Sequence, residues 1–121
     1  MARILLIEDS PTDTAVLTQL LERNGHQVLS SGSAEDGIEV CRREKPDLVL
    51  MDVVLPGMNG FQATRALSRD ADTKEIPVLI VSTKGMDTDK AWGLLQGAKD
   101  YIVKPPREDE LIARINGLLD A

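Results

Sequence analysis

Short runs of consecutive apolar residues alternate along this chain with segments in which apolar residues recur every three or four positions. The apolar runs cover residues 4–7, 48–51, 78–81 and 101–103, and a weaker run covers residues 27–29. Unbroken apolarity over so few residues predicts strands that are covered on both faces, as in a parallel sheet. The weaker run predicts an edge strand.

The segments between the strands have the period of amphipathic helices. Their apolar positions are Val16, Leu17, Leu20 and Leu21; Ala34, Ile38 and Cys41; Phe61, Thr64 and Leu67; Ala91, Leu95 and Ala98; and Leu111, Ile112, Ile115 and Leu119. Ser10, Pro11 and Asp13 give the first helix a start signal, and Gly25 gives it a stop signal. The alternation predicts an α/β fold, a flavodoxin-like (βα)5 doubly wound parallel sheet with strand order 2-1-3-4-5.

Composition and charge indicate one globular domain. With 42% hydrophobic and 28% charged residues, the 121 residues have room for one core and no output domain, so we expect a single domain over residues 1–121. Fourteen Lys and Arg against twenty Asp and Glu give a net charge of -6, which argues against binding to nucleic acid or to anionic membranes. No apolar run could span a bilayer, no signal-peptide pattern opens the chain, and Cys41 is the only cysteine. We therefore expect a cytoplasmic monomer.

Residues with reactive or charged side chains follow four of the predicted strands. Glu8 and Asp9 follow the first, Asp52 the third, Ser82 the fourth and Lys104 the fifth. Because the carboxyl ends of parallel strands meet at one edge, these groups should converge. Taken alone, each of these residues could equally be part of a helix cap, a strand end, a turn or a surface cation. Their combination favours a functional site. Three close carboxylates repel one another, so they either have raised pKa values or bind a cation, and an all-oxygen cluster suits Mg²⁺.

The segments that carry these residues resemble the CheY-like response regulator receiver family over essentially the whole chain. They are ILLIEDS at 4–10, DLVLMDVVLPGMNG at 47–60, PVLIVST at 77–83 and GAKDYIVKP at 97–105. The resemblance implies a stand-alone response regulator of a two-component phosphorelay. Such a protein is not a conventional enzyme: it accepts a phosphoryl group from a CheA-like sensor histidine kinase and signals through contacts with a downstream protein.

The resemblance also implies a role for each residue at the strand ends. Asp52 would be the phosphoacceptor, and Asp9 and Asp52 would bind Mg²⁺ together with the backbone carbonyl of Val54. Glu8 would act through a metal-bound water. The apolar side chain of Val54 cannot orient an attacking water, so we expect slow self-dephosphorylation.

Other residues match the family's phosphoryl-binding and switch positions. Ser82 would donate a hydrogen bond to one phosphoryl oxygen, and Lys104, before an expected cis bond to Pro105, would pair with another. Tyr101 matches the switch aromatic, which could move inward after phosphorylation. We expect Tyr101 to emerge between Lys90 and Arg114 and to form with them a partner face.

Within the family, GFQATRAL, DKAWG and the short tail after the last helix resemble PilH-type single-domain regulators of type IV pilus twitching motility. Chemotaxis is a second pathway that the pattern fits. A phosphate sink that drains a shared kinase remains an alternative to a signalling shuttle, as does a binding module that has lost phosphorylation.

Two alternatives belong to other functional classes. An FMN-binding electron carrier shares this topology, but it needs a Ser/Thr-rich phosphate loop where this chain has Glu8 and Asp9. A phosphohydrolase of the haloacid dehalogenase type needs a second Asp two residues after the nucleophile, where this chain has Val54.

Overall fold

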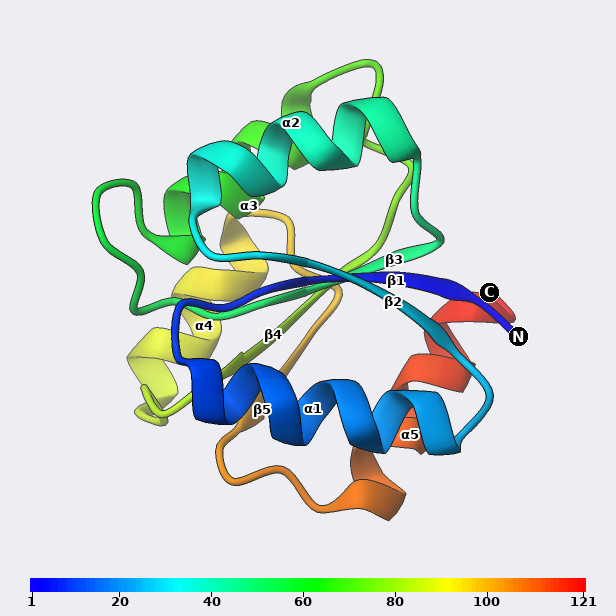
Figure 1. Ribbon diagram of the computed structural model, residues 1–121. Helices are drawn as coiled ribbons and strands as arrows, with labels where there is room; N and C mark the ends of the chain where they lie inside the picture. The colour runs from blue at the N-terminus through cyan, green and yellow to red at the C-terminus, as the bar shows by residue number, and fades with distance from the viewer.

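The computed structural model describes residues 1–121, in which five strands alternate strictly with five helices. The strands are β1 (Arg3–Ile7), β2 (Gln27–Ser31), β3 (Leu48–Met51), β4 (Val78–Ser82) and β5 (Asp100–Val103). The helices are α1 (Pro11–Arg23), α2 (Ala34–Glu44), α3 (Gly60–Arg69), α4 (Asp87–Leu95) and α5 (Glu108–Leu119). All strand pairs are parallel, in the order β2-β1-β3-β4-β5 (Figure 1). The expected flavodoxin-like fold is confirmed, including the edge position of β2.

The sheet has a hydrophobic core on each face because successive side chains of a strand point in opposite directions. Leu5, Ile7 and Met51 belong to the core under α2, α3 and α4. Ile4 and Leu50 belong to the core under α1 and α5, which lie together on the other face in Figure 1. The predicted apolar runs 4–7, 48–51 and 78–81 therefore lie in the central strands and are buried on both faces.

Two helices bury different residues from those expected. Val16 of α1 is exposed, and so are Ala91 and Leu95 of α4; of the positions predicted for the fourth helix only Ala98, which lies beyond its end, is buried. Helix α4 instead faces the core through Gly93, where a Cβ would lie 2.9 Å from Ile80 Cδ1 and 2.9 Å from Tyr101 Cδ2. A glycine adds nothing to a hydrophobic periodicity, so the pattern could not show which side of α4 is buried.

The local signals at the ends of α1 are confirmed. Ser10 is the N-cap, its side chain accepts a hydrogen bond from Asp13 N, and Pro11 occupies the first turn. Gly25 follows the helix with φ +87°, a conformation that favours glycine. The bond between Lys104 and Pro105 is cis, as expected.

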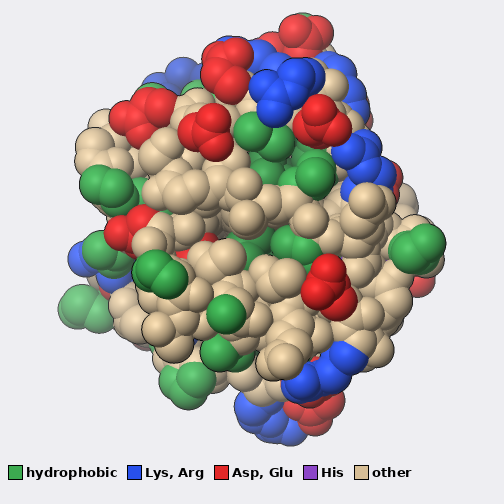
Figure 2. All heavy atoms as spheres, in the orientation of Figure 1, with side chains coloured by type: hydrophobic (Ala, Val, Ile, Leu, Met, Phe, Trp, Pro, Cys, Tyr) green, Lys and Arg blue, Asp and Glu red, His purple; other side chains and the backbone are tan.

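The surface carries charges of both signs in close mixture. Figure 2 shows acidic and basic side chains side by side where Figure 1 places α2. Arg42 of this helix forms ion pairs with both Glu39 and Asp70. None of the helices combines the length and the apolar composition that a membrane crossing would need.

Candidate functional site: an acidic rim with a largely buried lysine

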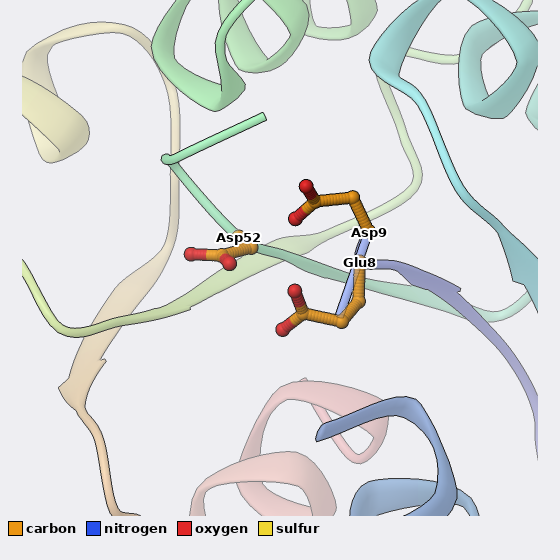
Figure 3. Close-up of side chains that lie close together, drawn as sticks. All are labelled: Glu8, Asp9 and Asp52. Atoms are coloured by element: carbon orange, nitrogen blue, oxygen red, sulfur yellow. The ribbon is translucent and has the colours of Figure 1, made fainter. Parts of the chain in front are cut away.

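Three carboxylates converge at the carboxyl edge of the sheet. Ile7 and Met51 are register partners, so Glu8 and Asp52 follow directly after paired residues of β1 and β3. One carboxylate oxygen from each of Glu8, Asp9 and Asp52 lies within 4.8 Å of those of the other two residues. Figure 3 shows the carboxylates of Glu8 and Asp9 directed toward Asp52. Glu8 and Asp52 are buried, whereas Asp9 is exposed, so the cluster is open to solvent on one side.

Backbone hydrogen bonds hold two of these acids in place. Asp52 N donates to Ile7 O at 3.0 Å, and Glu8 N donates to Ser31 O at 3.0 Å. One Asp52 oxygen, Oδ1, accepts from Val53 N at 2.7 Å. The other oxygen, Oδ2, therefore faces the rest of the rim.

The loop after Asp52 approaches it closely at Gly60, the first residue of α3. A Cβ at position 60 would lie 1.9 Å from the carbonyl oxygen of Asp52, a distance that no side chain can adopt. Gly60 N also donates to Val53 O at 3.0 Å. Glycine at this position thus allows the loop that contains Val54 to close over the end of β3, with the Val54 side chain exposed.

Lys104 follows β5 and lies among the acids. Its Nζ is 3.3 Å from Asp52 Oδ2 and 2.8 Å from Asp13 Oδ2, and it also donates a hydrogen bond to Glu8 Oε1. Only 10% of the lysine side chain is exposed. Burial acts to lower the pKa of Lys104, but the hydrogen bonds to Asp13 and Glu8 and the charge of Asp52 outweigh burial and raise that pKa. The ammonium group is therefore charged throughout the physiological range.

The pKa of Glu8 is raised, chiefly because the carboxyl is buried. Hydrogen bonds from Lys104 and from Ser10 N act in the opposite direction, while Asp52 adds to the increase. A buried carboxyl beside another carboxylate gains from a nearby positive charge. Lys104 provides one such charge, and a bound cation would provide more.

Ser82 ends β4 at the same rim and is fully buried. Its carbonyl accepts from Lys104 N at 2.9 Å, and its hydroxyl oxygen accepts from Lys84 N at 3.3 Å. The structure thus brings together the residues that the sequence placed at the strand ends.

Asp13 belongs to this cluster, although the sequence did not indicate it. The pattern of Ser10, Pro11 and Asp13 indicated only a helix cap, and no pattern in the sequence placed Lys104 near α1. The available signal was topological, because α1 starts where β1 ends and its first turn must therefore lie at the rim.

The expected partner face differs from the structure in one respect. Tyr101 is buried rather than exposed, and its hydroxyl donates a 2.6 Å hydrogen bond to Lys84 O. Arg114 is paired with Asp100 at 2.5 Å and lies 3.8 Å from Glu110, whereas Lys90 is half-buried and makes no ion pair. An exposed aromatic between two cations is therefore not present. The ring is buried because Gly93 leaves space for it under α4.

The fold and the rim define a class of phosphorylation-dependent signalling domains, and the chain belongs to it: the sequence profile of the response regulator receiver domain matches residues 4–116. One relative, Protein PilH from Pseudomonas aeruginosa PAO1, is 56% identical over 119 residues, which are 98% of this chain and 98% of PilH. The transcriptional regulatory protein AfsQ1 from Streptomyces coelicolor is 40% identical over 98% of this chain, but the match spans only 52% of AfsQ1.

A solved structure supports the same family. The receiver domain of the sensor histidine kinase PA1611 from Pseudomonas aeruginosa PAO1 superposes with a TM-score of 0.92 at 26% identity, covering 99% of this chain and 98% of that one. That structure has a magnesium ion coordinated in its active-site cleft.

Proposed function

We propose that this protein is a response regulator that accepts a phosphoryl group from a sensor histidine kinase on Asp52. One observation carries the proposal: Asp52, at the end of a central strand, has two further carboxylates within 4.8 Å and the Lys104 ammonium 3.3 Å from its outer oxygen. Three acids and a largely buried ammonium group have no structural need to meet at a strand end.

The residues of the rim fit Mg²⁺. Every side chain of the trio offers oxygen, the donor that Mg²⁺ prefers, and the exposed Asp9 leaves the cluster open to a hydrated ion. We assign Asp9 and Asp52 as direct ligands with the Val54 carbonyl, and Glu8 as a residue that acts through a metal-bound water. Bound Mg²⁺ would offset the negative charges of the carboxylate and the phosphoryl group.

In the proposed transfer, a carboxylate oxygen of Asp52 forms a bond to phosphorus while the bond from phosphorus to the donor's histidine nitrogen breaks. The leaving imidazole takes up a proton from solvent. Lys104 Nζ, already beside Asp52 Oδ2, donates to one phosphoryl oxygen, and the Ser82 hydroxyl donates to another. These groups require little rearrangement, which is how positioned charges accelerate phosphoryl transfer.

The 56% identity to PilH favours a role in type IV pilus twitching motility, with chemotaxis as the second pathway. We propose that the protein acts in the cytoplasm as a monomer, receives phosphate from a CheA-like kinase and contacts a downstream protein. A phosphate sink would use the same chemistry. Measuring phosphotransfer from every histidine kinase of the source organism distinguishes the two, because a sink drains a kinase that also serves another regulator.

The assignment of Asp52 is tested with acetyl phosphate and Mg²⁺, followed by intact mass measurement. One phosphoryl group should be added to the wild-type protein and none to Asp52→Asn. Asp47→Asn is the matched control, because Asp47 lies just before β3, at the opposite end of the same strand, and it should be labelled like the wild type. Labelling of Asp52→Asn equal to that of the wild type would overturn the proposal.

A further inference from the structure

The carboxylate of Asp13 makes no hydrogen bond within α1, the helix that contains it. An acid at the third position of a helix commonly reaches back to the N–H of the N-cap residue. Here Ser10 N donates instead to Glu8 Oε2 at 3.2 Å, and the Ser10 hydroxyl oxygen accepts from Asp13 N at 3.2 Å. The Asp13 side chain is left to bind Lys104 Nζ at 2.8 Å.

Helix α2 provides an internal comparison. Its N-cap Ser33 accepts from Asp36 N at 3.2 Å, so Ser33 and Asp36 repeat the spacing and the cap of Ser10 and Asp13. Asp36 is exposed and makes no ion pair. The contact between Asp13 and Lys104 is therefore not a general consequence of a Ser-x-x-Asp helix start.

We propose that Asp13 is a positioning residue that holds the Lys104 ammonium at the rim for phosphoryl transfer to Asp52. An ammonium group has three N–H donors, and in this structure Glu8, Asp13 and Asp52 accept from all three. Of these acceptors, Glu8 and Asp52 belong to the proposed metal and phosphoryl site. Asp13 lies outside that site and keeps its hydrogen bond to Nζ while the other two carboxylates change partners. This role rests on the proposed function.

The kinetic test is a double-mutant cycle on the full chain, with acetyl phosphate as donor and saturating Mg²⁺. Misplacing a charged group by about 1 Å can cost about a hundredfold in rate, so Asp13→Asn should slow labelling of Asp52 by about tenfold to a hundredfold. In a Lys104→Ala background, Asp13→Asn should cause no further slowing, because the group that it positions is gone. Asp36→Asn, which removes the same charge from an equivalent helix position, should be labelled at the wild-type rate.

A second measurement observes Lys104 directly and needs no phosphodonor. In 15N-labelled protein with Mg²⁺, the Lys104 ammonium resonance should be detectable at low temperature in the wild type and in Asp36→Asn, because hydrogen bonds slow its proton exchange. In Asp13→Asn the resonance should broaden beyond detection. A purely structural role of Asp13 would leave this resonance unchanged in any variant that stays folded.

Two results would overturn the proposal: wild-type labelling of Asp13→Asn, or equal slowing by this substitution with and without Lys104. The second result would indicate a general effect of charge. If the wild type itself is not labelled, the proposed function fails, and the ammonium resonance still decides whether Asp13 holds Lys104. Persistence of that resonance in Asp13→Asn would contradict the positioning role whatever the outcome of labelling.

Discussion

Gly93 of α4 lies against the ring of Tyr101. A Cβ at position 93 would lie 2.9 Å from Tyr101 Cδ2 and 3.1 Å from Cε2, so the ring or the helix would have to shift to admit it. The ring that fills this space is buried, and its hydroxyl donates to Lys84 O. The missing side chain of one residue thus allows the inward position of the proposed switch residue.

The first prediction follows from this packing. Gly93→Ala should destabilise the protein by about 1 kcal/mol, because overpacking costs about 1–3 kcal/mol while alanine in a helix recovers up to about 1 kcal/mol. Urea unfolding measures the change. Gly117→Ala in α5 is the control: nothing lies within 4 Å of its Cβ position, so it should stabilise by about 0.5–1 kcal/mol. Equal gains from both substitutions would show that the Tyr101 ring yields without cost.

A second prediction concerns the ion pair between Arg23 at the end of α1 and Glu108 at the start of α5. Hydrogen bonds from Arg23 and Asn24 lower the pKa of Glu108 to about 2, from an ordinary value of 4.5. Because the folded state favours the ionised form, this stabilisation is complete above pH 4.5 and is lost as the pH falls toward 2.

Glu108→Gln should therefore be less stable than the wild type at pH 7, and the two proteins should converge below pH 4.5. Urea unfolding at a series of pH values tests this expectation. Glu22→Gln is the control, since Glu22 is an exposed acid of α1 without an ion pair, and it should show no such convergence. A difference for Glu108→Gln that stays constant from pH 7 to pH 2 would contradict the assigned pKa.

The sequence predicted the convergence of Glu8, Asp9, Asp52, Ser82 and Lys104 because parallel strands end at one edge and apolar runs mark those ends. It could not predict which acids accept hydrogen bonds from Lys104. That depends on whether Ser10 N donates its hydrogen bond to Asp13 or to Glu8, because an Asp13 carboxylate engaged by Ser10 N would not be free for Lys104. Both acids are within reach in the sequence, and only the three-dimensional path of the first loop selects Glu8.

Helix α4 shows the limit of periodicity more clearly. Trp92, Leu94 and Leu95 are all exposed, and the buried residues are Gly93 and, just after the helix, Gln96. Prediction of a buried helix face from hydrophobic periodicity assumes that apolar side chains face the core. Here the core is filled by Tyr101, and the helix approaches it through a residue without a side chain.

The third prediction concerns metal binding. Mg²⁺ should bind the unphosphorylated protein reversibly, and Asp9→Ala should lose the Mg²⁺-dependent NMR shifts near Ser10 and Asp52. Asp9 is the exposed acid of the trio, so its replacement should change stability little, within about 0.5 kcal/mol. Asp36→Ala serves as a control for loss of an exposed acid. Shifts in Asp9→Ala identical to those of the wild type would place the metal site elsewhere.

The last prediction concerns the surface through which the signal leaves the domain, which we propose to be formed by α4, β5 and α5. Its cations differ in availability: Lys90 makes no ion pair, whereas Arg114 is bound to Asp100. Helix α4 also exposes the apolar side chains of Trp92 and Leu95, which suit an amphipathic partner segment.

Lys90→Ala and Arg114→Ala should leave labelling of Asp52 intact while they alter cellular output, measured as twitching or chemotactic response. The effect should be larger for Lys90, because Arg114 must first give up Asp100 before it can bind a partner. For Tyr101, Phe is the sharper replacement: the variant keeps an aromatic ring and lacks only the hydroxyl, so the inward position loses the hydrogen bond to Lys84 O, at a cost of about 1 kcal/mol. That loss should favour the outward ring and change output without changing phosphotransfer.

Lys74→Ala is the control. Lys74 is an exposed cation in the loop before β4, and its replacement should have no effect on output. Normal output from the Lys90, Arg114 and Tyr101 variants together would show that the signal leaves through another surface.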